Sequence, residues 1–283
     1  MLVPPATRDQ SIGALLVDSG KLTAAQAEAV LRHAREVGVR FGDAAVALGF
    51  VTPIDVQHAL ALQFDYPYLA PHDRAINKEV VAAFAPFSPA VEALRALRTQ
   101  LMLRWFGAEA PHKALALVSA QRAEGRSYLA ANLAVVFSQL GERTLLIDAD
   151  LRNPRQHLLF NLNSRSGLSA LLSGRGDGGA VQRIPGLVDL SVLPAGAIPP
   201  NPQELLGRSG FARLLDELGQ RFDVILLDTS AAALGADFQG VTTVTGGALL
   251  VTRRNVTRAG DALAVSERVG AGARAVGAVL NEH

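Results

Sequence analysis

One stretch of the sequence, residues 114–155, restricts the fold more than any other. An apolar run, Ala114 to Val118, leads into a polar loop that closes on Glu124-Gly125-Arg126-Ser127, and an amphipathic segment, Tyr128 to Leu140, follows. A second apolar run, Thr144 to Ile147, comes next. Strand, loop, helix and strand in this order predict a βαβ unit with the loop at the carboxyl end of the first strand. Ligands of open α/β sheets bind at that end.

The polar loop has the pattern of a phosphate-binding loop with substitutions. Gly125 and Ser127 fit the G-x-x-x-x-G-K-[ST] pattern, whereas Ala120 replaces its first Gly and Arg126 replaces its Lys. Backbone N–H groups of such a loop close around phosphate oxygens, and Arg126 keeps a permanent positive charge. An ordinary βα turn is the alternative that the loop alone leaves open. The expected nucleotide contacts are Ala123, Glu124, Gly125, Arg126, Ser127, Tyr128 and, from a later strand, Asp228.

Carboxylates at the ends of two strands predict a metal site beside this loop. Asp148 and Asp150 follow the second apolar run, and alternation along a strand aims both to the same side. A third apolar run, beginning at Phe222, ends in Asp228. Mg²⁺ takes hard oxygen ligands of this kind, although solvated loop acids are the alternative. The expected Mg²⁺ ligands are Ser127, Asp148 and Asp228.

Together, these elements resemble the bacterial P-loop tyrosine kinases of polysaccharide export, above all the chain-length-determinant kinases of exopolysaccharide clusters. The phosphate loop, the D-x-D-x-R pattern of Asp148, Asp150 and Arg152, and the strand ending at Asp228 carry the resemblance, which runs from about Ser88 to the end. The resemblance implies a protein-tyrosine kinase that uses ATP and Mg²⁺ and regulates exopolysaccharide chain length and export.

The resemblance also implies a role for each residue of the site. Arg126 would bridge the β and γ phosphates of ATP, because phosphoryl transfer depends on positioning and charge neutralisation. Asp150 would orient or deprotonate the tyrosine hydroxyl, and Asp228 would support the metal's water. Arg152 would contact the substrate or a neighbouring subunit. The implied catalytic residues are Asp148, Asp150, Arg152 and Arg126.

Three departures from the family pattern keep a second hypothesis open. The loop has lost two glycines, and Ser230 and Ala231 replace the prolines of a D-T-P-P strand end. The C-terminal sequence RAVGAVLNEH lacks the usual tyrosine cluster, and the tyrosines of the chain are Tyr66, Tyr68 and Tyr128. The kinase would then be slow or phosphorylate another protein. Alternatively, the chain is a weak or inactive nucleotide-binding adaptor that regulates polysaccharide export in response to cyclic di-GMP.

A partitioning-type ATPase of the cell-division and plasmid-segregation class is the alternative among P-loop proteins. That class places a Lys early in the loop, where this chain has Gln121, and does not normally have the Arg of the D-x-D-x-R pattern. Both features favour the kinase.

The N-terminal part of the chain contains an internal repeat, in which Ser11 to Thr23 matches Arg40 to Thr52. Each copy predicts a short helix that ends at a Gly, followed by a Thr that caps a second helix. The pairing resembles the N-terminal domain of type II secretion and pilus-assembly ATPases, some of which bind cyclic di-GMP. The first copy lacks the Arg and Gln of their binding motif, so a docking module without nucleotide is the alternative. The implied cyclic di-GMP residues are Arg40, Gly42, Gly49 and Gln63.

Length and patterning divide the chain into segments. At 283 residues the chain exceeds the size at which one core usually suffices. We expect a flexible tail over 1–10, the helical domain over 11–69, a linker over 70–90 and the kinase domain over 91–283. At least six strand-like runs alternate with helices in the last segment, which predicts an α/β fold with a doubly wound, mostly parallel sheet.

Charge and hydropathy restrict the setting. The formal net charge is +1, which favours neither nucleic acid nor an anionic membrane. No apolar run reaches the roughly 20 residues of a membrane span, and no signal peptide precedes the repeat, so a cytoplasmic protein is expected. The resemblance then implies a separate membrane chain-length-determinant protein, whose cytoplasmic tail activates the kinase and holds it at the inner membrane, and a protein-tyrosine substrate.

A helix near residue 91 carries a candidate assembly motif. Glu92, Arg95 and Arg98 have the spacing of the family's E-x-x-R-x-x-R ring-assembly motif, which implies a homo-oligomer. Charges at this spacing on a solvated helix face are the alternative.

Overall fold

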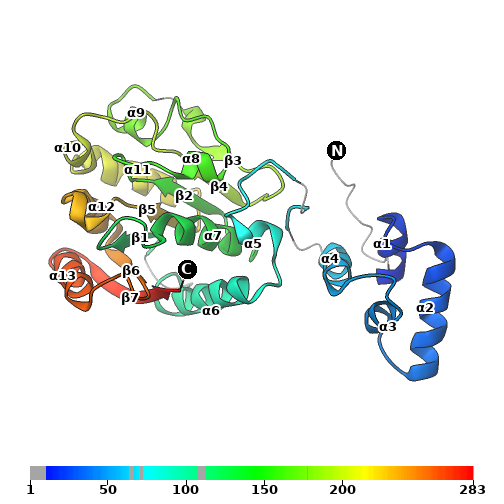
Figure 1. Cartoon of the computed structure of the whole chain (residues 1–283). Helices are drawn as coiled ribbons and strands as arrows, with labels where there is room; N and C mark the ends of the chain where they lie inside the picture. Colours follow the sequence, from blue (N-terminus) through cyan, green and yellow to red (C-terminus); the bar gives the residue numbers. More distant parts are fainter. Residues whose placement is uncertain (1–10, 64–66, 71–72, 108–111, 177, 283) are drawn as a thin grey trace. The chain divides into compact units, whose positions relative to one another are not determined.

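The chain divides into two compact units (Figure 1), one ending at Tyr68 and one beginning at Leu69. The predicted flexible tail lies outside the described residues. A computed structural model describes residues 11–63, 67–70, 73–107, 112–176 and 178–282.

The N-terminal unit consists of paired helices with a core of its own. Its helices are α1 (Ile12–Asp18), α2 (Ala24–Val37), α3 (Phe41–Ala47) and α4 (Pro53–Gln63). Helix α1 packs against α4 and α2 against α3, around buried Leu16, Val30 and Ala45. Both long helices begin at reciprocal caps, Thr23 with Gln26 and Thr52 with Asp55. The two copies of the internal repeat therefore share the same type of N-terminal capping box.

We expect Asp55→Ala to weaken the start of α4 by about 1 kcal/mol at pH 7, because the cap is lost. Burial raises the pKa of Asp55, but the hydrogen bonds from Lys21 and Thr52 outweigh it and lower the pKa to about 2. A lowered carboxyl pKa stabilises the folded state above the ordinary value of 3.8, and this stabilisation is lost as pH falls through about 2. Hydrogen exchange of the α4 amides should show a loss of protection in Asp55→Ala at pH 7 and a smaller loss of protection below pH 3.8. Asp43→Ala, at an exposed acid in the first turn of α3, is the control. An effect independent of pH would contradict the assignment.

A seven-stranded sheet forms the centre of the second unit, with the order β3-β4-β2-β5-β1-β6-β7. Every neighbouring pair is parallel except β3 with β4. The predicted α/β class and mostly parallel sheet are confirmed. The strands are β1 (Ala114–Ser119), β2 (Thr144–Asp148), β3 (Gln182–Arg183), β4 (Leu190–Leu193), β5 (Val224–Asp228), β6 (Gly247–Arg253) and β7 (Arg274–Asn281).

Helices cover both faces of the sheet (Figure 1). Alternate strand residues point to opposite faces, so Leu115 and Leu117 share a core with α5, α6 and α7. Ala116 and Val118 share the other core with the helices that follow β4. The helices are α5 (Val81–Phe84), α6 (Pro89–Arg104), α7 (Arg126–Ser138), α8 (Gln156–Leu159), α9 (Leu168–Leu172), α10 (Pro202–Leu206), α11 (Ser209–Gly219), α12 (Asp237–Thr245) and α13 (Ala259–Gly270).

Helix α7 differs from the amphipathic helix that the sequence predicts. Its residues from Leu129 to Ser138 are all buried, because α5 and α6 cover the side turned away from the sheet. Asn132 accepts a hydrogen bond of 2.9 Å from the Ala82 N–H, and Gln139 donates one of 3.0 Å to the Ala82 carbonyl. The segment containing α5 lies within the predicted linker and packs into this core.

Two further features concern helix boundaries. The helical segment that follows β4 is two helices, α10 and α11, separated by Gly207 and Arg208. Helix α7 begins at Arg126, two residues earlier than expected, so the last residues of the phosphate loop already lie in its first turn.

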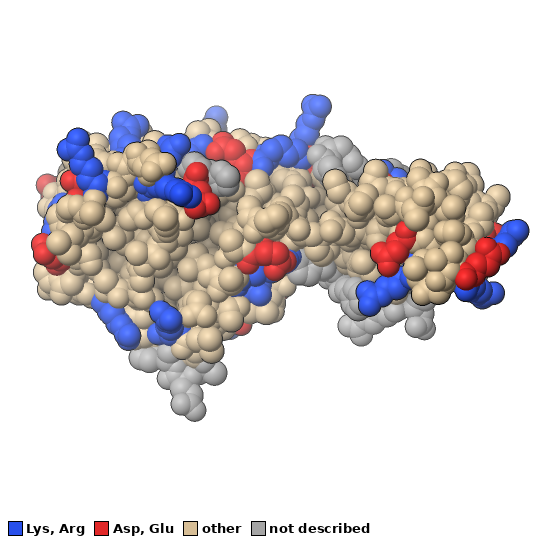
Figure 2. Space-filling model, turned by 60° about the horizontal axis from the view of Figure 1, so that its bottom comes forward, with Lys and Arg blue, Asp and Glu red and all other residues tan. Residues whose placement is uncertain are grey.

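Charged side chains are mixed on the face drawn in Figure 2, where Lys and Arg lie among Asp and Glu without one large patch of either sign. This distribution agrees with the formal net charge of +1.

Candidate functional site

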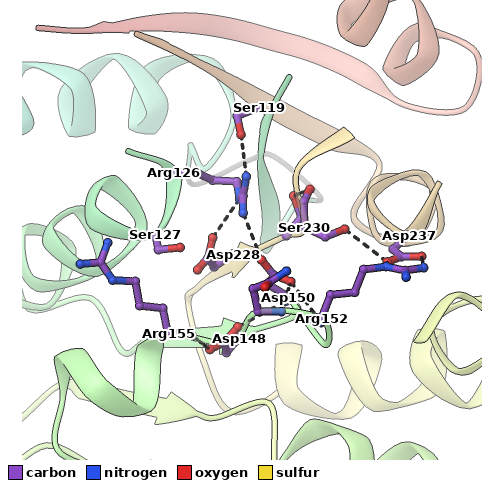
Figure 3. Close-up of polar contacts among 12 residues, drawn as sticks. Ser119, Arg126, Ser127, Asp148, Asp150, Arg152, Arg155, Asp228, Ser230 and Asp237 are labelled. Carbon is purple, nitrogen blue, oxygen red and sulfur yellow. Dashed lines mark hydrogen bonds and ion pairs between the residues drawn. The ribbon is translucent and has the colours of Figure 1, made fainter. Parts of the chain in front are cut away.

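The carboxyl ends of β1, β2 and β5 meet at the centre of the sheet. In the sheet, β5 lies between β2 and β1, and all three run parallel. Asp148 and Asp228 are direct partners across β2 and β5. The phosphate loop follows β1, so the topology brings it beside both aspartates (Figure 3). The two strand-end aspartates and the loop, predicted separately from the sequence, thus lie together.

The phosphate loop uses two residues in the left-handed region. Gly125 has φ of 91°, and Ala123 has φ of 60°, which is a strained conformation for a residue with a Cβ. A Cβ at position 125 would lie 2.0 Å from Asn281 Nδ2. The backbone angle therefore favours Gly at position 125, and a larger residue there would also displace the Asn281 amide.

Side chains from β6, β7 and the segment after β6 hold the loop in place. Glu124 is buried, and its carboxylate accepts hydrogen bonds from the Gln121 N–H, at 2.9 Å, and from the Thr257 hydroxyl. Arg253 donates to the Ala123 carbonyl at 3.1 Å, and Asn281 donates to the Glu124 carbonyl at 3.2 Å. The Glu124 side chain is thus occupied within the protein and braces the loop.

A cavity of about 230 Å³ opens beside the loop. It is lined by residues 122–127 and by Asp150, Asn153 and Arg155. Most of the predicted nucleotide-binding loop and the predicted catalytic Asp150 therefore border one space. Tyr128 does not border it. Three of the lining residues are arginines, which suits an anionic ligand such as a polyphosphate.

Arg126 turns toward the carboxylates (Figure 3). Its Nε lies 3.2 Å from Asp228 Oδ1, and its Nη2 lies 3.2 Å from Asp150 Oδ2. Its Nη1 donates to the Ser119 hydroxyl at 2.5 Å. The guanidinium is 8% exposed and links the ends of three strands. The sequence predicts an Arg126 that bridges phosphates, whereas in the structure its guanidinium nitrogens contact protein oxygens.

Asp148 organises the segment that follows β2. Its Oδ2 accepts hydrogen bonds of 2.9 Å from the Arg155 and Gln156 N–H groups, and its Oδ1 accepts one of 3.2 Å from the Asp150 N–H. Burial raises the pKa of the Asp148 carboxyl well above its usual range, and the charges of Asp228 and Asp150 raise it further. Asp148 therefore fixes the loop on which Asp150 lies.

Asp150 lies between the backbone of its own loop and Arg126. Its Oδ1 accepts hydrogen bonds from the N–H groups of Arg152, at 3.1 Å, and Asn153, at 2.9 Å. Burial raises the pKa of Asp150, and the Asn153 N–H and the Arg126 charge offset this only in part. The carboxylate is thus held in place at the wall of the cavity.

Arg152 does not join this cluster. Its Nη2 lies 3.0 Å from Asp237 Oδ1, and its Nε donates to the other oxygen of the same carboxylate. Asp237 begins α12 and is 2% exposed, and the Ser230 hydroxyl also donates to it. Arg152 therefore ties the loop after β2 to the loop after β5. The sequence does not single out Asp237, because no short-range pattern links it to Arg152.

Gln156 is a second residue that the sequence does not single out. Its Nε2 donates to Asp228 Oδ2 at 2.8 Å and to the Ser127 carbonyl at 3.1 Å. Because its own N–H donates to Asp148, Gln156 connects the phosphate loop with both strand-end aspartates. It lies on α8, a helix of one turn, which is too short to produce a periodic pattern.

Gln156→Leu should lower the free energy of unfolding by about 1–3 kcal/mol, because a buried carboxylate oxygen and a carbonyl would lose their donor. Urea denaturation followed by circular dichroism measures the change. Gln203→Leu, at an exposed position of α10, is the matched control and should have little effect. A loss no larger than that of the control would show that Gln156 does not hold these groups together.

The site contains oxygen donors of the kind that Mg²⁺ takes. Ser127, Asp148 and Asp228 offer a hydroxyl and carboxylates, and the buried Oε1 of Gln156 has no hydrogen-bond partner among the described residues. The donor set thus fits a hard cation in chemistry. Its arrangement is not that of a ready ligand shell, since no group of three or more His, Cys, Asp or Glu side chains in the described part of the chain could hold a metal.

The predicted assembly motif lies on α6. Arg95 pairs with Glu92 one helical turn away. Arg98 donates to the Val136 carbonyl of α7 at 2.7 Å. Arg98 thus helps to fasten α6 to α7 within the unit, and its role in assembly stays a prediction.

The predicted cyclic di-GMP residues lie on and beside α3 and at the end of α4. Arg40 directly precedes α3 without a capping side-chain hydrogen bond and, like Gln63 at the end of α4, is exposed. A Cβ at Gly42 would lie 2.7 Å from Val56 Cγ1, and Gly49 has φ of 69°. Helix packing and a helix end therefore account for both glycines.

Comparisons with known proteins place these features in context. No protein-family model matches the chain. The tyrosine-protein kinase YwqD of Bacillus subtilis is 33% identical over 207 residues, which are 73% of this chain and 86% of YwqD. The tyrosine-protein kinase Etk of Escherichia coli is 33% identical over 209 residues, but these cover 74% of this chain and only 28% of Etk.

Solved structures are also similar to this chain. The Etk kinase domain superimposes with a TM-score of 0.69 at 31% identity, over 77% of this chain and 85% of that domain. A chimerical protein, CapA2B2, superimposes with a TM-score of 0.68 at 31% identity, over 80% of this chain and 98% of the chimera.

None of the helices in the described part of the chain has the length and apolar character of a membrane span.

Proposed function

We propose, because the chain belongs to the family of bacterial tyrosine-protein kinases, that it transfers the γ-phosphoryl group of ATP to tyrosine in a protein. The observation that carries the proposal is the cavity bordered by both the phosphate loop and Asp150. Phosphoryl transfer requires a nucleophile held close to the phosphate and neutralised charge around it. Asp150 would hold the nucleophile, and the phosphate loop would neutralise the charge.

The residues of the cavity and of the strand ends beside it would divide the work as follows. Backbone N–H groups of residues 123–127 would bind phosphate oxygens, at the positive end of α7. Ser127, Asp148 and Asp228 would hold Mg²⁺, which neutralises charge that develops on the phosphates. Asp150 would accept a hydrogen bond from the tyrosine hydroxyl, orient it and take its proton. Arg152, paired with Asp237, would keep the Asp150 loop in place.

The acceptor tyrosine is proposed to lie on another protein. Tyr68 and Tyr128 are both half-buried, and the Tyr68 hydroxyl donates to the His58 carbonyl at 3.2 Å. Burial raises the pKa of Tyr128, and the Glu79 charge raises it further. Tyr66 lies outside the described residues.

The setting proposed is the regulation of exopolysaccharide chain length and export. The kinase would act at the inner membrane through a chain-length-determinant partner whose cytoplasmic tail activates it. CapA2B2, similar to this chain over most of its length, is itself a chimera, which agrees with such a two-component arrangement. A homo-oligomer would assemble through the α6 motif of Glu92, Arg95 and Arg98.

Phosphotyrosine formation with Mg²⁺-ATP, with and without the tail of the cognate membrane partner, tests the proposal. Signal that requires the tail and disappears in Asp148→Asn would establish a partner-activated kinase. Absence of signal under both conditions, with ATP binding intact, would contradict it.

A nucleotide-binding adaptor is the second candidate, and the pairing of Arg126 with Asp150 and Asp228 favours it, because the guanidinium that would bridge the phosphates is held by carboxylates of the protein. The N-terminal unit would then dock to a partner or bind cyclic di-GMP through Arg40 and Gln63. Calorimetry with cyclic di-GMP on the wild type and on Arg40→Ala distinguishes these roles. Binding that Arg40→Ala removes would support the nucleotide site, and no binding would leave the docking role.

A further inference from the structure

Three buried carboxylates lie at the carboxyl edge of the sheet beside one arginine of the protein. Asp148, Asp150 and Asp228 are 0%, 3% and 0% exposed. Buried carboxylates are costly unless they are paired with a cation or protonated. Among the described residues, Arg126 makes the ion pairs with this group, to Asp150 and to Asp228.

Arg126 is suited to this task by its shape. A guanidinium is a planar fork, and here separate nitrogens reach Asp228, Asp150 and the Ser119 hydroxyl. A Lys ammonium, the residue of the usual phosphate-loop pattern, is a single point charge that cannot extend across both carboxylates in the same way. The pairing is therefore a consequence of the Arg at this position.

We propose that Arg126 is an internal counter-ion that neutralises Asp150 and competes with the divalent cation for Asp228. In the conformation described, the guanidinium holds Asp228, one of the proposed Mg²⁺ ligands. Arg126 also borders the cavity, so a polyphosphate bound there offers its guanidinium an alternative anionic partner. Nucleotide phosphates draw Arg126 away from the carboxylates, and the metal then takes its place.

This competition couples the two ligands, and it rests on the proposed nucleotide site. The metal alone must displace a cation that is already paired, so it binds weakly. Once phosphates hold Arg126, the metal meets free carboxylates and binds tightly. Because coupling between binding sites is reciprocal, the metal strengthens nucleotide binding by the same factor.

Mn²⁺ binding without nucleotide, followed by electron paramagnetic resonance of free Mn²⁺, tests the proposal directly. Arg126→Lys and Arg126→Ala should bind Mn²⁺ at least about tenfold more tightly than the wild type, because a competing ion pair is weakened or removed. Arg143→Ala removes the same charge from a surface pair with Asp223 and should bind Mn²⁺ within about twofold of the wild type. Arg126→Lys keeps the positive charge, so the Mn²⁺ affinity can be measured on this variant if Arg126→Ala fails to fold.

ADP should raise the Mn²⁺ affinity of the wild type by at least about tenfold and that of Arg126→Ala by much less. Equal Mn²⁺ affinity of the wild type and Arg126→Lys without nucleotide would overturn the proposal. So would an ADP effect that is the same in the wild type and in Arg126→Ala. Neither measurement requires phosphoryl transfer, so an inactive kinase domain could still show the competition, and an active one could lack it.

Discussion

Asp150→Asn should reduce phosphotyrosine formation by about 10²–10⁴-fold while nucleotide binding persists, because a positioned general base is lost and the phosphate loop is not. Asn is nearly the same size, and its oxygen can still accept the backbone N–H groups of Arg152 and Asn153. Single-turnover phosphorylation of a tyrosine peptide, together with calorimetry of ADP binding, measures both quantities. Asp216→Asn, at an exposed position of α11, is the control. Unchanged turnover would remove Asp150 from the mechanism.

The same residue predicts the direction of a pH effect. Burial raises the pKa of Asp150 above the ordinary carboxyl value of 3.8. A general base works when ionised, so the rate should fall as pH decreases through that raised pKa, at a pH higher than an ordinary aspartate would give. Nearby Asp148, whose pKa is also raised, should contribute to the same acidic limb.

Trp105→Ala should lower the free energy of unfolding of the second unit by about 3–5 kcal/mol, because a large buried ring leaves a cavity. Trp105 is 1% exposed, and its Nε1 donates to the Ala114 carbonyl at 2.9 Å. Its ring stacks on His112 at 3.9 Å and fills the space beside Gly247, where a Cβ would lie 2.4 Å from it. The ring therefore joins the end of α6 to β1 and β6.

Differential scanning calorimetry measures this loss, which corresponds to a fall in Tm of roughly 2–4 °C per kcal/mol for a unit of this size. Leu103→Ala on the same helix is the control, because Leu103 is 75% exposed and exposed substitutions change stability by less than about 0.5 kcal/mol. A Tm change equal to that of Leu103→Ala would mean that the ring packing contributes little.

The sequence predicts the central strands and their aspartates because those strands are buried on both faces, which makes them continuous apolar runs. The positions of Asp148 and Asp228 are then predictable, because a carboxylate at the end of an apolar strand lies at the carboxyl edge of a parallel sheet. The phosphate loop is predictable for the same reason. These features depend on residues close together in the chain.

The remaining features depend on contacts that no local pattern records. The contacts of Arg126 with Ser119, Asp150 and Asp228 require the geometry of three strand ends at once, which no local sequence pattern contains. Asp237 and Gln156 lie on elements whose helical periodicity is absent or weak, and their partners are distant in sequence. Helix α7 is buried all round because α5, from the predicted linker, covers it.

The alignment of Asp148 with Asp228 across β2 and β5 has a consequence for tolerance of deletions. Each carboxylate faces the site only while its strand keeps its length, because the loss of one residue within the strand turns the carboxylate to the opposite face of the sheet. In a library of single-codon deletions under selection for function, losses within Thr144–Asp148 or Val224–Asp228 should disappear. Losses within the exposed stretch at 197–198 should persist far longer, because no catalytic side chain depends on its length.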